Sequence, residues 1–214
     1  MSGPIPAAAD GAAPARVVLA SHNPHKLVEL RRVLGPRLDG IELVGYDGPE
    51  PAETGTSFEE NALIKARAAA AHSGLPAIAD DSGISVDILG GAPGIFSARW
   101  SGPAKDARAN VDLLLWQLSD IEEPHRGASF TSAAAYAMPD GRELAVLGRW
   151  PGRIVSELRG EHGFGYDPVF LPEGSDRTAA ELADAEKDAS SHRRRAFDAL
   201  MPRLREVLGL ESAS

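Results

Sequence analysis

The sequence AIADDSGISVDI, residues 77–88, joins a short apolar run to two adjacent carboxylates. Ala77–Ala79 is typical of a buried strand, and we expect it to end at a turn over Asp80–Gly83. Beyond that turn, isoleucine and valine alternate with other residues over 84–88, which predicts another strand. Because ligands collect at the ends of strands in open α/β sheets, this stretch indicates both a sheet and a site.

Towards the N-terminus, strands alternate with helices. The apolar runs Val17–Ala20 and Ile41–Val44 predict strands, and Lys26–Leu34 predicts a helix that stops at the glycine and proline that follow it. Ser57–Glu60 is a capping box, with Ser57 as the cap and Glu60 placed to reach back. It predicts the start of an alanine-rich helix that extends to about residue 71.

Towards the C-terminus, residues 127–137 and 143–150 predict two strands joined as a hairpin by the turn Met138–Gly141. A helix is expected before them, over Asn110–Leu118. Two helical stretches should follow, one opened by a second capping box at Thr178–Glu181 and one with apolar residues over 197–208. Pro202 lies inside the last stretch and is expected to kink that helix or to end its first half.

This order of elements predicts an α/β fold with a mixed sheet and a cleft among the glycine-bounded loops. We expect residues 1–15, which are small and rich in proline and alanine, to form a disordered arm. Residues 16–209 would then form a single domain, and residues 210–214 a short tail.

Composition narrows the function classes. Of the 214 residues, 43% are apolar and 25% charged, as in ordinary globular proteins. No apolar run approaches the length of a membrane span, and cysteine is absent, which excludes disulfides and zinc–thiolate sites. The net charge of −9 disfavours broad nucleic-acid binding, although a small polyanion could still bind through a metal ion and a few local cations. We therefore expect a soluble protein of the cytoplasm.

The adjacent carboxylates Asp80 and Asp81 are the first candidate for chemistry. Two such groups are costly side by side unless a cation offsets their repulsion, which points to metal binding or base catalysis. Neighbouring side chains on a strand point to opposite faces, so only one of the pair needs to face the site. The alternative is a polar turn capped by an aspartate.

Other candidates lie in loops and at helix starts. Ser21–Lys26 stands between a strand and a helix, where backbone N–H groups and a lysine attract anions. Glu53, in a glycine-containing loop, could join the oxygen shell of a magnesium ion. Phe164, between two glycines, offers an aromatic face to a base. Lys187 and Arg193 would lie near a helix N-terminus. Each has an ordinary structural alternative, namely a capped loop, a packed turn or a solvated charge.

Taken together, these segments resemble the inosine/xanthosine triphosphate pyrophosphatase family from about Val17 to Leu208. The motifs that carry the resemblance follow the family's order: Ser21–Lys26, Glu53-Thr54-Gly55, Ser57–Ala62, Ala79–Gly83, Gly91–Arg99, Gly163–Pro168 and Ser191–Arg193. The match around Lys187 is looser. The resemblance implies an elongated, two-lobed α/β fold around a long mixed β-sheet with flanking helices and a central cleft, and usually a homodimer.

The resemblance also implies roles for individual residues. Asp81 would be the catalytic proton acceptor and a Mg²⁺ ligand, and Glu53 would be the second acidic group at the metal. The implied substrate-binding residues are Ser21, His22, Asn23, Pro24, His25, Lys26, Ser82, Phe164, Gly165, Tyr166, Asp167, Lys187, His192 and Arg193. Asp167 could accept hydrogen bonds from the N–H groups of a purine ring.

The implied reaction is hydrolysis of ITP, dITP or XTP to the monophosphate and pyrophosphate. Water would attack the α-phosphorus with help from Mg²⁺ and Asp81. Hypoxanthine and xanthine carry a carbonyl at C6, so a donor from His192, Arg193 or a backbone N–H could favour them over adenine by about 10⁴-fold.

Three other functions remain open from the sequence. A non-catalytic nucleotide-binding regulator would have no need of the acidic residues Glu53, Asp80 and Asp81. A phosphatase with Asp81 as its nucleophile would release orthophosphate. A pyrophosphatase for modified pyrimidine nucleotides would differ only in its substrates.

Overall fold

The computed structural model describes residues 13–22 and 24–210, and these form one mixed sheet with helices on both faces. The sheet order is β2-β1-β3-β4-β5-β6, in which β1 is parallel to β2 and β3, and the remaining pairs are antiparallel. The strands are β1 (Ala15–Leu19), β2 (Ile41–Val44), β3 (Ala77–Val86), β4 (Gly127–Ala137), β5 (Glu143–Ile154) and β6 (Phe170–Pro172).

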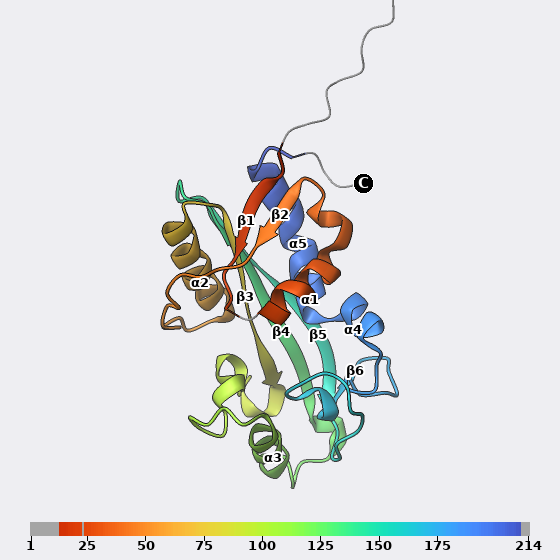
Figure 1. Cartoon of the computed structure of the whole chain (residues 1–214). Coiled ribbons are helices and arrows are strands. Elements are labelled where there is room, and N and C mark those ends of the chain that lie inside the picture. The colour runs from red at the N-terminus through yellow and green to blue at the C-terminus, as the bar shows by residue number, and fades with distance from the viewer. Residues whose placement is uncertain (1–12, 23, 211–214) are drawn as a thin grey trace, which may run out of the picture.

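The fold is elongated, because three of these strands run through both of its lobes (Figure 1). One lobe contains β1, β2, α1 (Pro24–Leu34), α2 (Phe58–Ser73) and α5 (His192–Val207). The other contains α3 (Ala107–Gln117) beside the far ends of β3–β5. The helix α4 (Asp184–Ser190) precedes α5, and the 3₁₀ helices are η1 (Gly35–Leu38), η2 (Asp87–Leu89), η3 (Gly94–Arg99), η4 (Glu123–His125) and η5 (Asp167–Val169). The α/β class with two lobes is confirmed.

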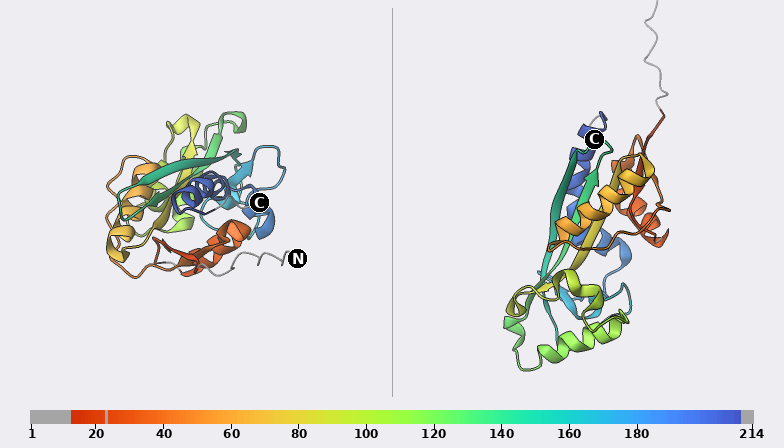
Figure 2. Two further views of the ribbon diagram at one scale, coloured as in Figure 1. Left: turned by 90° about the horizontal axis from the view of Figure 1, so that it is seen from above. Right: turned by 90° about the vertical axis from the view of Figure 1, so that its left-hand side faces the viewer.

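Separate apolar cores fill the two faces of the sheet. On one face, residues of α1 and α5 such as Leu30, Phe197 and Leu200 pack against Leu19 and Ile78. On the other face, the alanines of α2 let that helix approach the alanine-rich part of β4 closely. Figure 2 shows α2 and α5 on opposite sides of the sheet. A side chain of β3 therefore packs against α1 and α5 if it points to one face of the sheet, and against α2 if it points to the other.

Local sequence signals explain most of the element boundaries. Ser57 caps α2 by accepting a hydrogen bond from the backbone N–H of Glu60, and Gly74 ends this helix in the left-handed conformation. The reciprocal half of the predicted box is shifted by one residue, because the Glu60 carboxylate accepts from Thr56 N–H at 2.5 Å. The expected hairpin is also present, and its second strand extends to Ile154.

The expected turn at Asp80–Gly83 is wrong, because β3 continues without interruption from Ala77 to Val86. Each of its residues pairs with one of β4, from Ala77 opposite Ala137 to Val86 opposite Ala128. The long partner strand supplies hydrogen bonds along the whole segment, so pairing outweighs the local turn preference of aspartate and glycine. The two carboxylates therefore lie in the middle of a strand and not at its end.

Two expectations near the C-terminus are also corrected. Thr178–Glu181 has the hydrogen bond of a capped helix start, since the Glu181 carboxylate accepts from Thr178 N–H at 2.7 Å, yet the next helix begins only at Asp184. Of the two outcomes expected for Pro202, an end of the helix is wrong, because α5 continues to Val207. Burial of the neighbouring Met201 and Leu204 offsets the backbone hydrogen bond that proline removes.

Of the expected N-terminal arm, residues 1–12 lie outside the described part of the chain, and Ala15 already belongs to β1. Of the expected tail, residues 211–214 lie outside it as well. Within the described ranges, no helix is both long and apolar enough to cross a bilayer.

Candidate active site

The candidate site lies where β3 loses its neighbour on one side. β1 pairs with β3 only through Val18 and Leu19, opposite Ala77 and Ile78. Among the described residues, no strand pairs with this outer edge of β3 over residues 80–84. The unpaired edge begins where β1 ends and the Ser21–Lys26 segment follows. Ligands bind at such interruptions in open α/β sheets.

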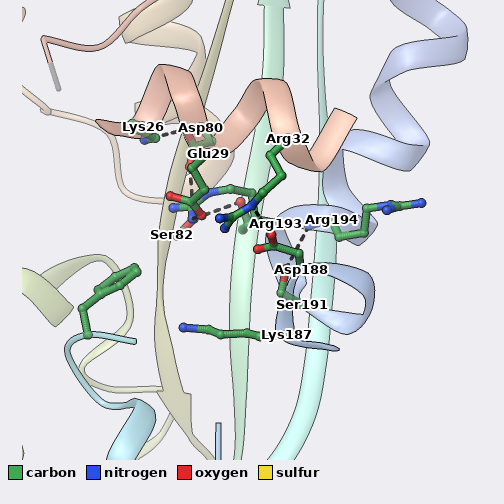
Figure 3. Close-up of polar contacts among 12 residues, drawn as sticks. Lys26, Glu29, Arg32, Asp80, Ser82, Lys187, Asp188, Ser191, Arg193 and Arg194 are labelled. Atoms are coloured by element: carbon green, nitrogen blue, oxygen red, sulfur yellow. Dashed lines mark hydrogen bonds and ion pairs between the residues drawn. The ribbon is translucent and has the colours of Figure 1, made fainter. Parts of the chain in front are cut away.

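Asp80 lies on the face of β3 that is covered by α1 and α5. Its carboxylate pairs with Lys26 of α1 at 2.5 Å and with Nε of Arg193 of α5 at 3.2 Å. Arg193 also pairs with Glu29 of α1 at 2.7 Å, so the two helices are joined through one buried charge network (Figure 3). The Asp80 side chain is 1% exposed. A carboxylate this deeply buried is stable only because its cationic partners accompany it.

The same network sets the protonation of Asp80. Burial alone would raise the pKa of this carboxyl, but Lys26 and Arg193 outweigh burial and lower its pKa well below the usual range. Asp80 therefore stays ionised at neutral and mildly acidic pH. It can hold cations in position but is too weak a base to accept a proton.

Asp81 lies on the opposite face of β3, under α2. Its carboxylate accepts from Lys65 Nζ at 2.9 Å and from the amide of Asn61 at 3.4 Å. The same lysine reaches Glu53 of the loop before α2, at 3.0 Å. Lys65 and Asn61 are four residues apart on α2, so both project from one side of that helix. Glu53 and Asp81 thus meet at a single ammonium group.

The protonation of Asp81 is shifted in the other direction. Burial raises the pKa of this carboxyl, and the attraction of Lys65 does not fully offset the effect. A carboxylate with a raised pKa is a better proton acceptor near neutral pH than an ordinary aspartate. Of the two adjacent carboxylates, Asp81 has the electrostatic environment of a general base.

The two carboxylates that pair with Lys65 are suitable ligands for a magnesium ion. Magnesium takes oxygen ligands and is usually held by one or two carboxylates, with water and substrate phosphates in the other positions. Glu53 and Asp81 supply two carboxylates that converge on one cation. Within residues 13–22 and 24–210 there is no group of three or more acidic or histidine side chains suited to a metal. The residues therefore fit an ion that the substrate helps to hold.

A pocket of about 540 Å³ opens beside the Asp80 face of β3. Its walls come from both lobes and include Ser82 and Gly83 of β3, Phe130 of β4, the loop Gly163–Asp167, and Lys187, His192 and Arg193. The volume is that of a small-ligand site. Ser82 donates to Ser132 Oγ at 2.9 Å and lies 3.5 Å from the Asp80 carboxylate. The pocket and the Asp80 network are therefore contiguous.

The Gly163–Asp167 loop presents an aromatic ring to this pocket. Phe164 is 66% exposed, and Lys187 Nζ lies 4.9 Å from the centre of its ring. Asp167 is buried, and its carboxylate accepts from Phe164 N–H at 2.7 Å and from Lys187. Side chains at Gly163 would collide with this carboxylate. Asp167 and Lys187 thus hold the loop in place and leave the Phe164 ring uncovered.

His192 forms the buried wall of the pocket and is uncharged. Its ring stacks on Phe130, with centroids 4.9 Å apart. Burial, reinforced by the neighbouring charges of Arg193 and Lys187, lowers the pKa of His192 to about 3. Its Nδ1 atom is buried without a hydrogen-bond partner among the described residues. A neutral imidazole offers one donor and one acceptor, and so can read the edge of a base.

The Gly91–Arg99 motif closes the pocket from the second lobe. Ser97 Oγ donates to Gly94 O at 2.6 Å and accepts from Ile84 N–H at 2.9 Å. The Tyr166 hydroxyl donates to Ser97 O at 2.9 Å, and burial raises its pKa. Gly83 touches Gly94 and Ser97 so closely that a side chain at position 83 would collide with them. Tyr166, predicted to contact substrate, is thus also a packing link between the lobes.

The structure divides the predicted residues of the Ser21–Lys26 segment. Lys26 belongs to the Asp80 network, whereas the His22 ring turns towards Tyr46 and Gly48 in the loop after β2. Asn23 lies outside the described residues, as do the side chains of Pro24 and His25. Gly165 lines the pocket in the left-handed conformation.

Sequence reasoning missed several residues of the site. Lys65 and Asn61 lie in the predicted alanine-rich helix, where two polar residues four positions apart form a polar stripe on one face and are the signal that could have identified them. Glu29, Arg32 and Asp188 also line the pocket, and Arg32 pairs with Asp188 at 2.6 Å across α1 and α4. No local pattern identifies them, because their pairing depends on how distant helices pack.

Known proteins match this chain over most of its length. The model of the Ham1 family matches residues 17–203. The dITP/XTP pyrophosphatase of Leifsonia xyli is 58% identical over 192 residues, which cover 90% of this chain and 96% of that protein.

Solved structures agree in fold. The Ham1 protein of Staphylococcus aureus has a TM-score of 0.82 at 35% identity, covering 90% of this chain and 99% of that one. A dITP/XTP pyrophosphatase from Mycobacterium abscessus has a TM-score of 0.74 at 54% identity, covering 89% and 100%. With a family model over most of the chain, relatives well above 30% identity and the same fold, the chain belongs to the Ham1 family.

Proposed function

We propose that this protein hydrolyses non-canonical purine nucleoside triphosphates, namely ITP, dITP and XTP, to the monophosphate and pyrophosphate. Relatives more than 50% identical to this chain are named dITP/XTP pyrophosphatases. The reaction removes deaminated purines from the nucleotide pool. We place it in the cytoplasm, in keeping with a cysteine-free chain, and expect a homodimer in solution, which light scattering would test.

The observation that carries this proposal is the pair Asp81–Glu53, joined by Lys65, at the open edge of β3. A binding protein has no use for two carboxylates held against each other with one pKa raised. The pocket with the exposed Phe164 ring lies beside the same strand. The pocket would bind the base and the carboxylate pair would carry out the chemistry, and one elongated ligand could reach both.

The substrate would lie across the open edge of β3. The base stacks on Phe164 in the pocket, and stacking of a base on an aromatic ring contributes about 1–3 kcal/mol. The triphosphate then passes the edge between Ser82 and the Ser21–Lys26 segment. Lys26 and Arg193, held by Asp80, offset its negative charge near the ribose end. On the far side of the edge, the phosphates meet Asp81, Glu53 and Lys65.

Magnesium fits beside Glu53 and Asp81, where it would neutralise phosphate charge and make water more acidic. Asp81 accepts a proton from the attacking water at its carboxylate, for which its raised pKa suits it. Lys65 keeps both carboxylates in place and adds a positive charge beside the phosphates. Attack at the α-phosphorus then releases pyrophosphate as the leaving group.

Base selection falls to His192 and Arg193. Two donor groups of Arg193 are already engaged by Asp80 and Glu29, which fixes the direction of the guanidinium. His192 is neutral and stacked, so its hydrogen-bonding pattern is fixed by its tautomer. A donor aimed at a C6 carbonyl accepts hypoxanthine and xanthine and is left facing another donor with adenine.

The deciding experiment is a substrate panel with separate assays for pyrophosphate and orthophosphate. ITP, dITP and XTP should release pyrophosphate far faster than ATP or GTP. Activity should vanish with a chelator and return with Mg²⁺. Release of orthophosphate would identify a phosphatase, a preference for modified pyrimidines would identify the related pyrophosphatase, and binding without turnover would identify a regulator.

A further inference from the structure

His22 belongs to the Ser21–Lys26 segment, yet its contacts lie in another loop. Its Nε2 atom is 2.7 Å from the carbonyl oxygen of Gly48. A carbonyl only accepts hydrogen bonds, so Nε2 carries a proton and donates it. The His22 ring also stacks on Tyr46, with centroids 5.4 Å apart and an interplanar angle of 27°. These contacts join the end of β1 to the loop that follows β2.

The partner loop is packed tightly around this contact. Tyr46 is buried, and its hydroxyl donates to Pro49 O at 2.8 Å. His72, at the end of α2, meets the edge of the Tyr46 ring at a centroid distance of 5.7 Å. A methyl group at position 48 would lie 2.5 Å from both the Tyr46 hydroxyl and the His72 ring. Gly48 is therefore the residue that lets the aromatic cluster His22–Tyr46–His72 close.

The same loop carries Glu53. Its far end is fixed to α2, because Gly55 N–H donates to Asn61 at 2.9 Å and Thr56 N–H donates to Glu60. Its near end is fixed at Gly48 by the hydrogen bond from His22. Glu53 lies between these two anchors and pairs with Lys65. The near anchor connects the Glu53 loop to His22, at the start of the segment that ends in Lys26.

We propose that His22 is a positioning residue that fixes the Glu53 loop to the Ser21–Lys26 segment, and so holds the Mg²⁺ carboxylate in register with the triphosphate cations. This assignment rests on the proposed function and replaces direct substrate contact as the role of His22. Two groups that must act on neighbouring phosphates are most useful when their separation is set before the substrate binds. The contact between His22 and Gly48, called the tether below, sets this separation without touching the substrate.

Hydrogen exchange of the full-length protein tests the tether without any assay of activity. His22→Ala removes both the hydrogen bond and the stacking. This hydrogen bond is partly buried, and its loss should accelerate amide exchange over residues 46–53 by roughly threefold to tenfold. Gly48→Ala, which disrupts the cluster from the other side, should accelerate exchange in the same loop. Unchanged exchange in both variants would overturn the proposal.

The functional arm compares Mg²⁺ dependence with substrate dependence. In His22→Ala, the Mg²⁺ concentration for half-maximal rate should rise by about threefold to tenfold, and calorimetric Mg²⁺ affinity in the presence of a non-hydrolysable nucleotide should fall by the same factor. The nucleotide KM at saturating Mg²⁺ should change little. A raised nucleotide KM with unchanged Mg²⁺ dependence would show that His22 binds substrate directly, and would sink the proposal.

Matched variants separate the hydrogen bond of His22 from its stacking on Tyr46. His22→Gln keeps a donor within reach of Gly48 O and should restore most of the Mg²⁺ affinity, whereas His22→Phe keeps only the stacking and should restore less. His72→Ala removes a ring from the cluster but no link to the Ser21–Lys26 segment, so its Mg²⁺ dependence should match the parent. Equal effects of His72→Ala and His22→Ala would reduce the cluster to ordinary packing. If the parent chain hydrolysed no triphosphate, the proposed function would fail while the exchange arm still tested the tether.

Discussion

Asp80 and Asp81 are neighbours on one strand, yet they lie in two regions with opposite electrostatics. On the α1/α5 face, Asp80 is buried with two cations that lower its pKa. On the α2 face, Asp81 shares one lysine with a second carboxylate, and burial raises its pKa. The difference follows from strand geometry, because consecutive side chains point to opposite faces. One region holds cations for binding, and the other prepares a base for chemistry.

The largest expected effect separates the two residues by activity. Asp81→Asn preserves shape but cannot accept a proton, so kcat should fall by about 10²–10⁴-fold at saturating Mg²⁺. The folded state should lose less stability than in Asp80→Asn, because burial disfavours the ionised form of Asp81 and Lys65 keeps Glu53 as a partner. Steady-state kinetics and denaturant unfolding of the same preparation measure both quantities. Turnover within a few-fold of the parent would remove Asp81 from the mechanism.

The second effect is on stability and concerns Asp80. Asp80→Asn leaves the charges of Lys26 and Arg193 without their shared buried partner, and breaking a buried ion pair in this way costs about 3–5 kcal/mol. Denaturant midpoints at an unchanged m-value measure the loss. The matched control is Asp81→Asn, one residue away on the other face. If the two variants were equally stable, the contrast between the two faces would be lost.

The contrast between these carboxylates was only partly accessible from the sequence. Local signals such as the Ile41–Val44 run and the Ser57 cap gave elements that the structure confirms, because their stability is decided within a few residues. The continuity of β3 was not accessible, since it depends on pairing with a strand some fifty residues away. The sequence also indicated that only one aspartate need face the site, but could not show that the other would anchor Lys26 and Arg193.

Lys65 illustrates the same limit at the candidate site. Its helix was predicted, but the face that it shares with Asn61 was not, and the strand residue that it meets is a property of packing between α2 and β3. In contrast, the two glycines that flank Phe164 predicted an aromatic face open to a base, with an inward-packed turn as the alternative, and the ring is exposed. The exposure of a residue in a glycine-bounded loop can be predicted from nearby sequence, whereas the partner of a charged side chain depends on how distant elements pack.

The third effect is the response to pH, which should differ between the two regions. Asp81 must be ionised to act, and its pKa is raised, so kcat/KM should fall as pH drops through that raised value, by up to about tenfold per unit. The pKa of Asp80 in the folded protein is lower than the ordinary aspartate value of about 3.9. Asp80 therefore contributes its full stability above that ordinary value, and the contribution is lost only as pH falls further, through the pKa of the folded state. Between about pH 4 and 7, activity should therefore decline while the fold persists. Circular dichroism beside the rate profile tests this, and coincident loss of fold and activity would contradict it.

The smallest expected effect belongs to the pocket on the Asp80 side. Phe164 offers a ring face, and stacking depends on that face more than on which purine meets it. Phe164→Ala should therefore weaken kcat/KM for ITP, XTP and ATP alike, by about 1–3 kcal/mol, and leave their ratios unchanged. Phe164→Tyr keeps the ring and should retain most of the activity. Because Asp167 and Lys187 still hold the loop backbone in the alanine variant, the loss reports on the ring itself. A selective loss of ITP and XTP would instead assign base reading to Phe164, and would leave His192 as a packing partner of Phe130 and Arg193 as one of the two cations held by Asp80.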